Sequence, residues 1–385
     1  MTEQLYYNDS YLSSFRAKIL SCEEKNGVYE VILDRTAFFP EGGGQPGDRG
    51  VIGACEVIDT KLENGEIIHL CRGKVSGEAD CSIDWKFRFS NMQQHTGEHI
   101  FSGVLHSLTG FDNVGFHMGK EEVTVDFNGA VNSETLALAE KKTNEFIYKN
   151  APVTCFYPAQ NEIKNYDYRS KKEVEGALRL VEIEGADLCA CCGTHVRFAG
   201  EVGMVKVITS ENYKGGVRIT LKIGEKALED YIEKNNSVLE ISSALCAKYG
   251  EVSQAVKKLQ EKQNDLRIEL YKANEKIAEL TARDYSEARP FVFDSSSDPE
   301  TARMAANIGA KKVEVAFAFS GNDGDGYKYV VSSLTRDVRP VSKELNSFLE
   351  GRGGGKPEMA MGSVKACRAE IEEFLLKNFA NGGNK

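Results

Sequence analysis

Two short segments rich in metal-binding side chains lie far apart in the chain, and a fold that uses both must bring them together. The first, His95-Thr96-Gly97-Glu98-His99, places two imidazoles four residues apart, so that on a helix both project from one face. The second, Cys189-Ala190-Cys191-Cys192-Gly193-Thr194-His195, presents Cys191 and His195 on either side of a Gly-Thr turn. Imidazole and thiolate are donors that Zn²⁺ prefers, so the two segments together predict a zinc site.

The ten cysteines fit a reducing compartment better than a disulfide framework. The first residues, MTEQLYYNDSYLSSF, lack the basic and apolar regions of a secretory signal, and no apolar run predicts a membrane span. We therefore expect a cytoplasmic protein in which clustered cysteines bind metal. Cys189 is the expected substitute ligand because it shares the parity of Cys191, whereas Cys192 is expected to point away. A reduced cysteine cluster packed in a core is the alternative.

Changes of pattern along the chain predict an α+β protein of several parts. Short alternating segments between turn residues predict a small β-barrel over residues 1–88. Helical spacing from Ser90 to Gly110, and a second helix over 133–150 with Ser133 as its N-cap, predict an α+β domain over 89–224. The length of 385 residues, with 41% hydrophobic and 28% charged residues, suffices to bury such cores.

A heptad repeat runs through the polar segment 225–288. Two offset rows of apolar residues recur every seven positions between Leu245 and Leu280, interrupted by Gln263. Gly250 is expected to break the segment into two helices. The repeat predicts either a helical linker or hairpin, or a coiled coil that makes the protein a homodimer.

Alternating apolar residues predict a small α/β domain over 289–385, which offers another surface for a homodimer. Two strands are expected around Val313–Phe319 and Tyr327–Val331. The segment Asn322-Asp323-Gly324-Asp325-Gly326 between them predicts a hairpin turn. It does not predict a calcium loop, because no Glu stands at the twelfth position.

Four motifs, in order, resemble those of the editing domain of alanyl-tRNA synthetase and its free-standing AlaX relatives. The segment 36–48, TAFFPEGGGQPGD, resembles the family's glycine-rich loop, and Leu5-Tyr6-Tyr7 ahead of it also fits. His-Thr-x-x-His and Cys-x-Gly-Thr-His-Val follow, and GRGGGKPEMA at 351–360 resembles the signature of the C-terminal DHH-associated domain. Because no adenylate-forming domain has room ahead of residue 1, the likeness is to the long AlaX architecture, and we expect no tRNA charging.

The resemblance implies a hydrolase that removes Ser, and often Gly, from mischarged tRNA(Ala). It implies one Zn²⁺ per chain, held by His95, His99, Cys191 and His195. The ion could polarise the ester or activate a water, or it could anchor the terminal adenosine while a separately held water attacks. Four protein ligands close a tetrahedral site, so the first role needs a labile ligand or a fifth position.

Further site residues are expected around these ligands. Thr96 is expected to support the face of the helix that carries the histidines, and the alternative is a surface threonine. His117, within Val114–Met118, is expected to hydrogen-bond the substrate hydroxyl or a water, and the alternative is a structural histidine. Glu98 is expected to be an exposed helix carboxylate, with a general base as the alternative. The glycine-rich loop is expected to cap the pocket or to contact the acceptor end of tRNA through Gly43, Gly44 and Gln45. The alternative is that the loop is only a turn of the β-barrel.

A net charge of 48 − 58 = −10 argues against a nucleic-acid partner only if basic residues are not clustered. The sequence contains two clusters expected to contact tRNA phosphates. The first, ahead of the Cys-His motif, comprises Lys164, Arg169, Lys171 and Lys172, of which Arg169 and Lys172 are the predicted tRNA contacts. The second surrounds glycines that let backbone N–H groups approach a phosphate, and its predicted contacts are Arg352, Gly354 and Lys356. Solvated surface and a flexible loop are the alternatives.

Two other functions remain open from the sequence. His95–His99 also matches H-x-x-E-H, the inverted zinc-peptidase signature, with Glu98 as base and Glu173 or Glu175 as third ligand. That assignment leaves Cys191 and His195 without a role. A zinc-stabilised tRNA-binding module without hydrolysis is the second alternative.

Overall fold

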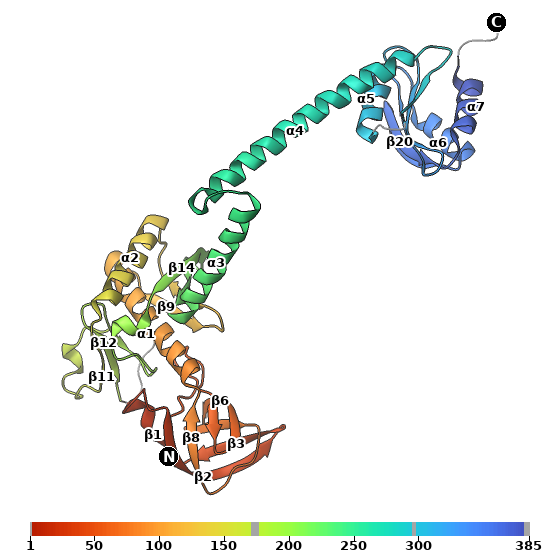
Figure 1. Cartoon of the computed structure of the whole chain (residues 1–385). Coiled ribbons are helices and arrows are strands. Elements are labelled where there is room, and N and C mark those ends of the chain that lie inside the picture. The colour runs from red at the N-terminus through yellow and green to blue at the C-terminus, as the bar shows by residue number, and fades with distance from the viewer. Residues whose placement is uncertain (1, 171–176, 295–297, 381–385) are drawn as a thin grey trace. The chain divides into compact units, whose positions relative to one another are not determined.

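The computed structural model describes residues 2–170, 177–294 and 298–380, which form a mixed α+β structure (Figure 1). The chain divides into two compact units, Met1–Glu240 and Ile241–Lys385. The four-part division drawn from the sequence stays a prediction. Among the described residues, no helix has both the length and the apolar character that crossing a bilayer requires.

Six strands of the first unit are hydrogen-bonded in a closed ring, in the region where the sequence predicts a β-barrel. Their order around the ring is β2 (Ser14–Lys25), β3 (Val28–Leu33), β7 (Glu66–Cys71), β6 (Cys55–Glu63), β5 (Gly50–Ile52) and β8 (Glu78–Ile83). β8 pairs again with β2 and closes the ring. Val31, Leu33 and Phe38 are fully buried within it. A short parallel pair, β1 (Glu3–Gln4) and β4 (Arg35–Thr36), precedes the glycine-rich loop.

A long helix, α1 (Trp85–Thr109), carries the His-x-x-x-His motif. It begins before the predicted start at Ser90, because Asp84 is the N-cap and accepts a hydrogen bond from the Phe87 N–H. It ends as predicted at Gly110, whose left-handed φ of 71° closes the last turn.

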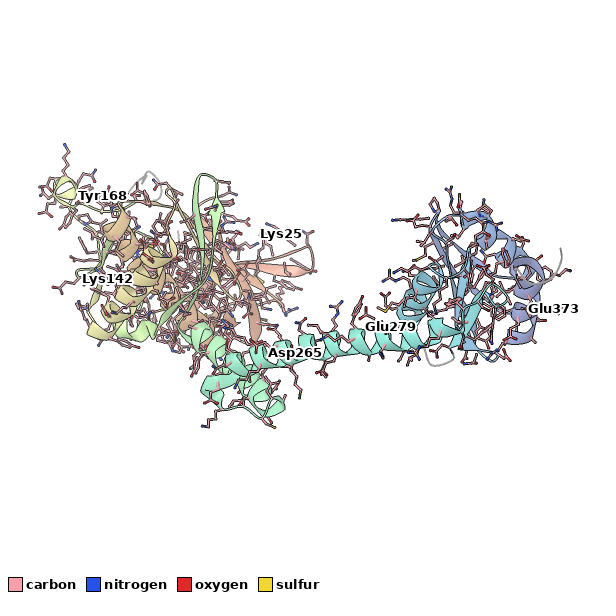
Figure 2. The ribbon with its side chains drawn as sticks, turned by 90° about the horizontal axis from the view of Figure 1, so that it is seen from above. Lys25, Lys142, Tyr168, Asp265, Glu279 and Glu373 are labelled. Atoms are coloured by element: carbon pink, nitrogen blue, oxygen red, sulfur yellow. The ribbon has the colours of Figure 1, made fainter. Side chains whose placement is uncertain are left out.

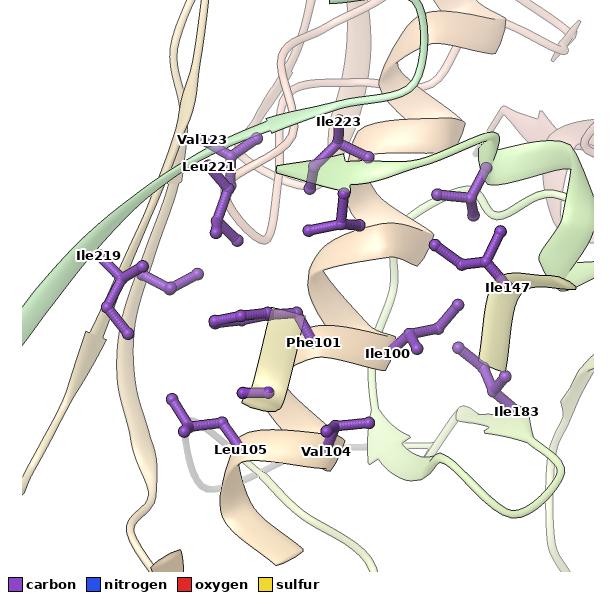
Figure 3. Packing of buried hydrophobic residues seen from close by; sticks show 14 of the residues in the cluster. Ile100, Phe101, Val104, Leu105, Val123, Ile147, Ile183, Ile219, Leu221 and Ile223 are labelled. Atoms are coloured by element: carbon purple, nitrogen blue, oxygen red, sulfur yellow. The ribbon is translucent and has the colours of Figure 1, made fainter. Parts of the chain in front are cut away.

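An antiparallel sheet and a second helix pack against α1. The sheet has the order β14 (Val205–Tyr213), β15 (Gly216–Ile223), β10 (Val123–Phe127) and β9 (Asn113–Met118). Figure 3 shows Phe101 and Leu105 of α1 packed among Ile219 and Leu221 of β15, with Ile147 of the second helix nearby. That helix, α2 (Ser133–Lys149), is capped by Asn132 and not by Ser133, because the Asn132 side chain accepts from Thr135.

A three-stranded sheet brings the Cys-His motif to α1. Its order is β11 (Val153–Phe156), β12 (Leu180–Ile183) and β13 (Asp187–Ala190), and the motif follows β13 directly. Two glycines allow close packing on α1. A Cβ on Gly97 would lie 2.6 Å from the Ile223 side chain, and a Cβ on Gly103 would lie 2.2 Å from the Ala186 carbonyl oxygen. The backbone of α1 is therefore in direct contact with its neighbours.

The heptad segment forms two helices, α3 (Glu225–Ala244) and α4 (Val252–Thr281), and the break at Gly250 is confirmed. Asp265 and Glu279 are exposed along α4 (Figure 2). The apolar rows are exposed as well, with Leu259 at 54% and Leu270 at 61%. A coiled coil and a homodimer stay predictions.

The second unit contains a five-stranded sheet. Its order is β16 (Phe291–Asp294), β17 (Ala316–Asn322), β18 (Gly326–Ser332), β20 (Met359–Val364) and β19 (Arg352–Lys356). The helices of this unit beyond α4 are α5 (Pro299–Gly309), α6 (Arg339–Phe348) and α7 (Arg368–Phe379). The hairpin between β17 and β18 is confirmed. The glycine-rich segment is not a loop but the exposed strand β19, because its backbone pairs with β20 along its whole length.

Candidate metal centre

The structure brings His95, His99, Cys191 and His195 together. One donor atom from each of these four residues lies within 4.8 Å of the others, so the group could hold a metal ion. His95 and His99 lie one turn apart on α1, and the other two follow β13. The Cys191 Sγ lies 3.4 Å from the His95 Nε2. A tetrahedral zinc ion with Zn–S of ~2.3 Å and Zn–N of ~2.0 Å needs donors about 3.3–3.8 Å apart, and this pair fits.

Each imidazole is oriented by a hydrogen bond at its Nδ1 atom. His95 Nδ1 lies 2.9 Å from the Gln45 Oε1, and His99 Nδ1 lies 3.0 Å from the Asp187 carboxylate. Both partners only accept, so Nδ1 carries the proton and the Nε2 lone pair is available for a metal. His195 Nδ1 lies 3.1 Å from the Thr96 hydroxyl. Three rings oriented in this way favour a metal site over a merely packed histidine cluster.

Gln45 is a buried supporting residue of this site. Its amide is fixed at both ends, because Nε2 donates to the Thr194 hydroxyl (2.8 Å) and Oε1 accepts from the Thr194 N–H (3.2 Å). The glycine-rich loop therefore meets the metal centre through Gln45. Gly43 and Gly44 are exposed and line the adjoining cavity, with φ of 59° and 84°. The expectation that this loop meets the pocket agrees with its position.

Thr96 and Gly193 join the two motifs. Thr96 is fully buried, and its hydroxyl also accepts from the Val196 N–H, so it does not face solvent. A Cβ on Gly193 would lie 2.1 Å from the His95 Cε1, so only glycine lets the Cys-His loop approach the helix this closely.

A pair formed by the buried Asp187 and the half-buried Arg169 supports His99 from behind. Arg169 donates to both oxygens of Asp187 at 2.7 and 2.9 Å. Burial opposes the charge on Asp187, but hydrogen bonds from His99 and Arg169 outweigh it and lower the pKa of this carboxyl. Arg169 is thus tied to the metal centre, and its phosphate contact stays a prediction. Lys172 lies outside the described residues, as do Lys171, Glu173 and Glu175.

A cavity of about 770 Å³ opens beside the donors. His95, His99 and Cys191 line it, so a ligand inside would reach the centre from the side of these three residues. Other lining residues are Tyr7, Gly43, Gly44, Val114, Gly115, Phe116, Tyr157, Ser170, Ala177, Arg179, Cys189, Ala190 and Cys192. Burial raises the pKa of Tyr7 to about 12, so its hydroxyl stays protonated at neutral pH.

The structure does not support the expected substrate contact of His117. His117 is exposed, and its neighbour Phe116 is the residue that lines the cavity, with its ring stacked on His95 at 5.2 Å. Both lie on β9, where successive side chains point to opposite faces. From this segment, Val114, Gly115 and Phe116 line the cavity and His117 does not.

The expectation that Glu98 is exposed is wrong. Glu98 is fully buried, and its carboxylate accepts from the Ser102 hydroxyl and the Asn113 amide, both at 2.6 Å. These partners explain how a carboxylate is buried beside two histidines. They also position Glu98 away from the cavity lining described above, which does not support a peptidase base.

The two spare thiols differ in burial, and the expected role of Cys189 as a substitute ligand stays a prediction. Cys189 is buried, and with His99 and Asp187 it forms a second group that could hold a metal. Cys192 is exposed at the cavity. In the second unit, Arg352, Gly354 and Lys356 are all exposed on β19.

Sequence reasoning missed Asp187, Arg179 and Tyr157. The sequence offered one indication for Asp187: it lies two and four residues before Cys189 and Cys191, so on a strand its side chain points to the same face as theirs. Arg179 donates to the carbonyl oxygens of Cys191 (2.8 Å) and Gly193 (3.0 Å), and it thereby holds the ligand loop. Nothing in the sequence marks Arg179 or Tyr157.

Comparison with known proteins relates this site to a family. Residues 178–220 match the "Threonyl and Alanyl tRNA synthetase second additional domain", and residues 290–380 match the "DHHA1 domain". The chain is 32% identical to the alanyl-tRNA editing protein AlaX-L of Pyrococcus horikoshii, over 98% of both chains. It is 28% identical to the alanyl-tRNA editing protein Aarsd1-A of Xenopus laevis, over 96% of both.

Longer proteins match over part of their length. The chain is 28% identical to the alanine–tRNA ligase of Methanopyrus kandleri, over 98% of this chain and 44% of the ligase. The crystal structure of the C-Ala domain from Aquifex aeolicus alanyl-tRNA synthetase matches 24% of this chain and 89% of that one, at 24% identity and a TM-score of 0.21.

Proposed function

Because the chain belongs to the family of alanyl-tRNA editing proteins, we propose that it is a zinc-dependent deacylase of mischarged tRNA(Ala). The substrate is Ser-tRNA(Ala), with Gly-tRNA(Ala) as a second candidate. One observation carries this proposal: three residues of a His/Cys group that could hold a metal line a cavity of about 770 Å³. The site has both the donors for hydrolysis and the room for an aminoacyl ester.

The need for such an activity follows from the limits of binding selectivity. A synthetic site for Ala cannot strongly exclude the smaller Gly, nor Ser with its one added hydroxyl. Differences of this size give only about 1–3 kcal/mol of discrimination. A second, hydrolytic site that acts on the product raises accuracy beyond that limit.

The donors and their partners define the chemistry available. When bound, zinc polarises an ester carbonyl and acidifies a water. His95, His99 and Cys191 would present the ion to the cavity, while His195 would hold it from the Thr96 side. The lining residues of the described chain include no carboxylate. We therefore assign no carboxylate general base among the described residues.

The tRNA partner follows from the same family membership. We assign the exposed basic residues of β19, Arg352 and Lys356, to phosphate contact, supported by their position at the ends of a strand whose three central residues are glycines. Replacing both with Ala should weaken tRNA binding and reduce the slope of its salt dependence by about 2. An unchanged slope would remove this assignment.

The direct test is hydrolysis of Ser-tRNA(Ala) by purified, zinc-loaded protein. His95→Ala combined with His99→Ala should abolish both zinc binding and hydrolysis. His117→Ala is the matched control: it removes an exposed histidine from β9 and should retain both properties. Absence of hydrolysis above buffer by the zinc-loaded protein would end the proposal, and tRNA binding that persists without turnover would favour the binding-module alternative.

A further inference from the structure

The cavity is larger than an aminoacyl group requires. Its volume of about 770 Å³ lies in the upper part of the range of about 300–1,000 Å³ that small-molecule sites occupy. A seryl group has only a handful of non-hydrogen atoms. If the ester lies at the metal centre, the remaining space receives the part of tRNA to which the ester is attached, which is the 3′-terminal nucleoside.

One wall of this cavity is aromatic. Tyr7 and Tyr157 both line it, and their rings meet edge to face, with centroids 6.5 Å apart and an interplanar angle of 89°. Tyr157 is 53% exposed and lines the cavity, so its ring is accessible to a ligand there. Tyr7 is half-buried and packs on Tyr6 with centroids 4.6 Å apart. The pair thus combines a fixed inner ring with an accessible outer ring.

The aromatic wall is held at a set position relative to the metal donors. The Arg179 guanidinium lies over the Tyr7 ring at 5.2 Å. The same guanidinium donates to the carbonyl oxygens of Cys191 and Gly193. One side chain therefore contacts both the wall and the ligand loop, which ties the position of Tyr7 to that of the metal donors.

We propose that Tyr157, braced by Tyr7, is the stacking surface for the base of the 3′-terminal nucleoside of the bound tRNA. The inference rests on the proposed function. Proteins commonly bind unpaired bases by stacking them on aromatic side chains, and this contact tolerates any base. Tyr157 therefore positions the acceptor end without reading the identity of the tRNA, which must be read elsewhere on the molecule.

The test uses tRNA(Ala) whose terminal adenine is replaced by fluorescent 2-aminopurine, together with seryl-tRNA(Ala) for kinetics. Wild-type protein should quench the fluorescence, because stacking quenches this base. Tyr157→Ala should abolish the quench and raise KM about tenfold with kcat nearly unchanged, whereas Tyr157→Phe should behave as wild type. Tyr148→Ala is the matched control, since Tyr148 is 78% exposed on α2 and should change neither reading.

The outcomes separate this inference from the proposed function. Equal quenching by wild type and Tyr157→Ala, or no quenching by wild type, would overturn the stacking site even if hydrolysis occurs. Quenching that depends on Tyr157 in a protein without hydrolysis would support the stacking site and refute the deacylase. An unchanged zinc content in Tyr157→Ala shows that the variant has kept its metal centre.

Discussion

Two segments with three consecutive glycines look alike in the sequence and differ in the structure. In the first, Gly42–Gly44, the backbone folds into a tight turn with an isolated bridge between Gly42 and Gln45, and Gly43 and Gly44 have left-handed φ values. In the second, Gly353–Gly355, the backbone is extended and pairs with β20. Glycine allows left-handed backbone angles in the first segment and close pairing of neighbouring strands in the second.

The surroundings of the two segments explain this difference. Asp48, just after the first turn, forms a fully buried ion pair with Arg88 of α1, which also donates to the Ser10 and Ala37 carbonyls. The turn is thus tied to the helix that carries the histidines. The second segment lies at the edge of its sheet and is exposed over 352–356. A glycine run therefore has no fixed meaning until the structure shows what holds its ends.

The largest expected effect comes from breaking the buried pair. Arg88→Met would leave Asp48 buried without its cation and should lower the free energy of unfolding of the first unit by about 3–5 kcal/mol. Arg352→Met, at the exposed segment, should change stability by less than about 0.5 kcal/mol. Urea unfolding followed by the fluorescence of Trp85, the one tryptophan in the sequence, reports on the first unit, and circular dichroism followed in the same titration reports on both units. Equal midpoints for the two variants would contradict the contrast.

Acid should loosen the first unit through His69. Burial lowers the pKa of His69 from 6.5 to about 4. Between pH 4 and pH 6.5 the imidazole is protonated in the unfolded chain but neutral in the folded one. The free energy of unfolding therefore has its full value above pH 6.5 and falls by about 3 kcal/mol as the pH is lowered toward 4. All six histidines precede residue 240, so the second unit lacks this response.

The measurement compares wild type with His69→Gln, both metal-free, by urea unfolding at pH 7 and pH 4.5. The variant should lose stability at pH 7, where the Thr36 and Val31 contacts of His69 are intact. Its stability should also fall less on acidification. Parallel pH profiles for the two proteins would exclude His69 as the titrating group.

Alanine substitutions at Gly44 and Gly354 compare the two glycine segments at one position each. A Cβ on Gly44 would lie 2.4 Å from the Phe116 ring, at a φ of 84°, so Gly44→Ala should cost about 2–3 kcal/mol and reduce hydrolysis. A Cβ on Gly354 meets nothing within 4 Å, so Gly354→Ala should be neutral or slightly stabilising. A neutral Gly44→Ala, measured in the same unfolding assay, would show that the turn can move away from Phe116.

The smallest of these effects concerns Gln45. Gln45→Ala removes the acceptor that orients His95, and zinc affinity should fall about 10- to 100-fold. Gln45→Glu keeps an acceptor at the same position and should lose less. Competition with a chelator measures both affinities. If the two variants bind zinc equally, the orientation of His95 does not depend on this hydrogen bond.

Sequence patterns predicted the features that depend on local spacing. The helix that carries His95, the break at Gly250 and the hairpin after Asn322 follow from periodicity and turn residues, and the structure confirms them. The family resemblance is confirmed as well. The grouping of the four donors agrees with the sequence, while their metal binding stays a prediction.

Features that depend on tertiary packing were not accessible from the sequence. Glu98 reads as an exposed helix residue, yet Ser102 and Asn113 satisfy it in the interior. His117 and Phe116 are neighbours, and only the facing of β9 decides which one meets the cavity. Arg179 donates to backbone carbonyl oxygens, and every residue type has one, so the sequence does not identify its partners.

The contact of α1 with its neighbours at Gly97 and Gly103 has a consequence for metal exchange. The helix backbone has no room to shift toward β15 or toward Ala186, so the spacing of His95 and His99 is rigid. The carbonyl oxygens of Cys191 and Gly193 are held by hydrogen bonds from Arg179, which stretch more easily than packed backbone. If the site binds zinc as proposed, a larger ion should be accommodated by displacement of the Cys191 side of the site, while His95 and His99 keep their spacing.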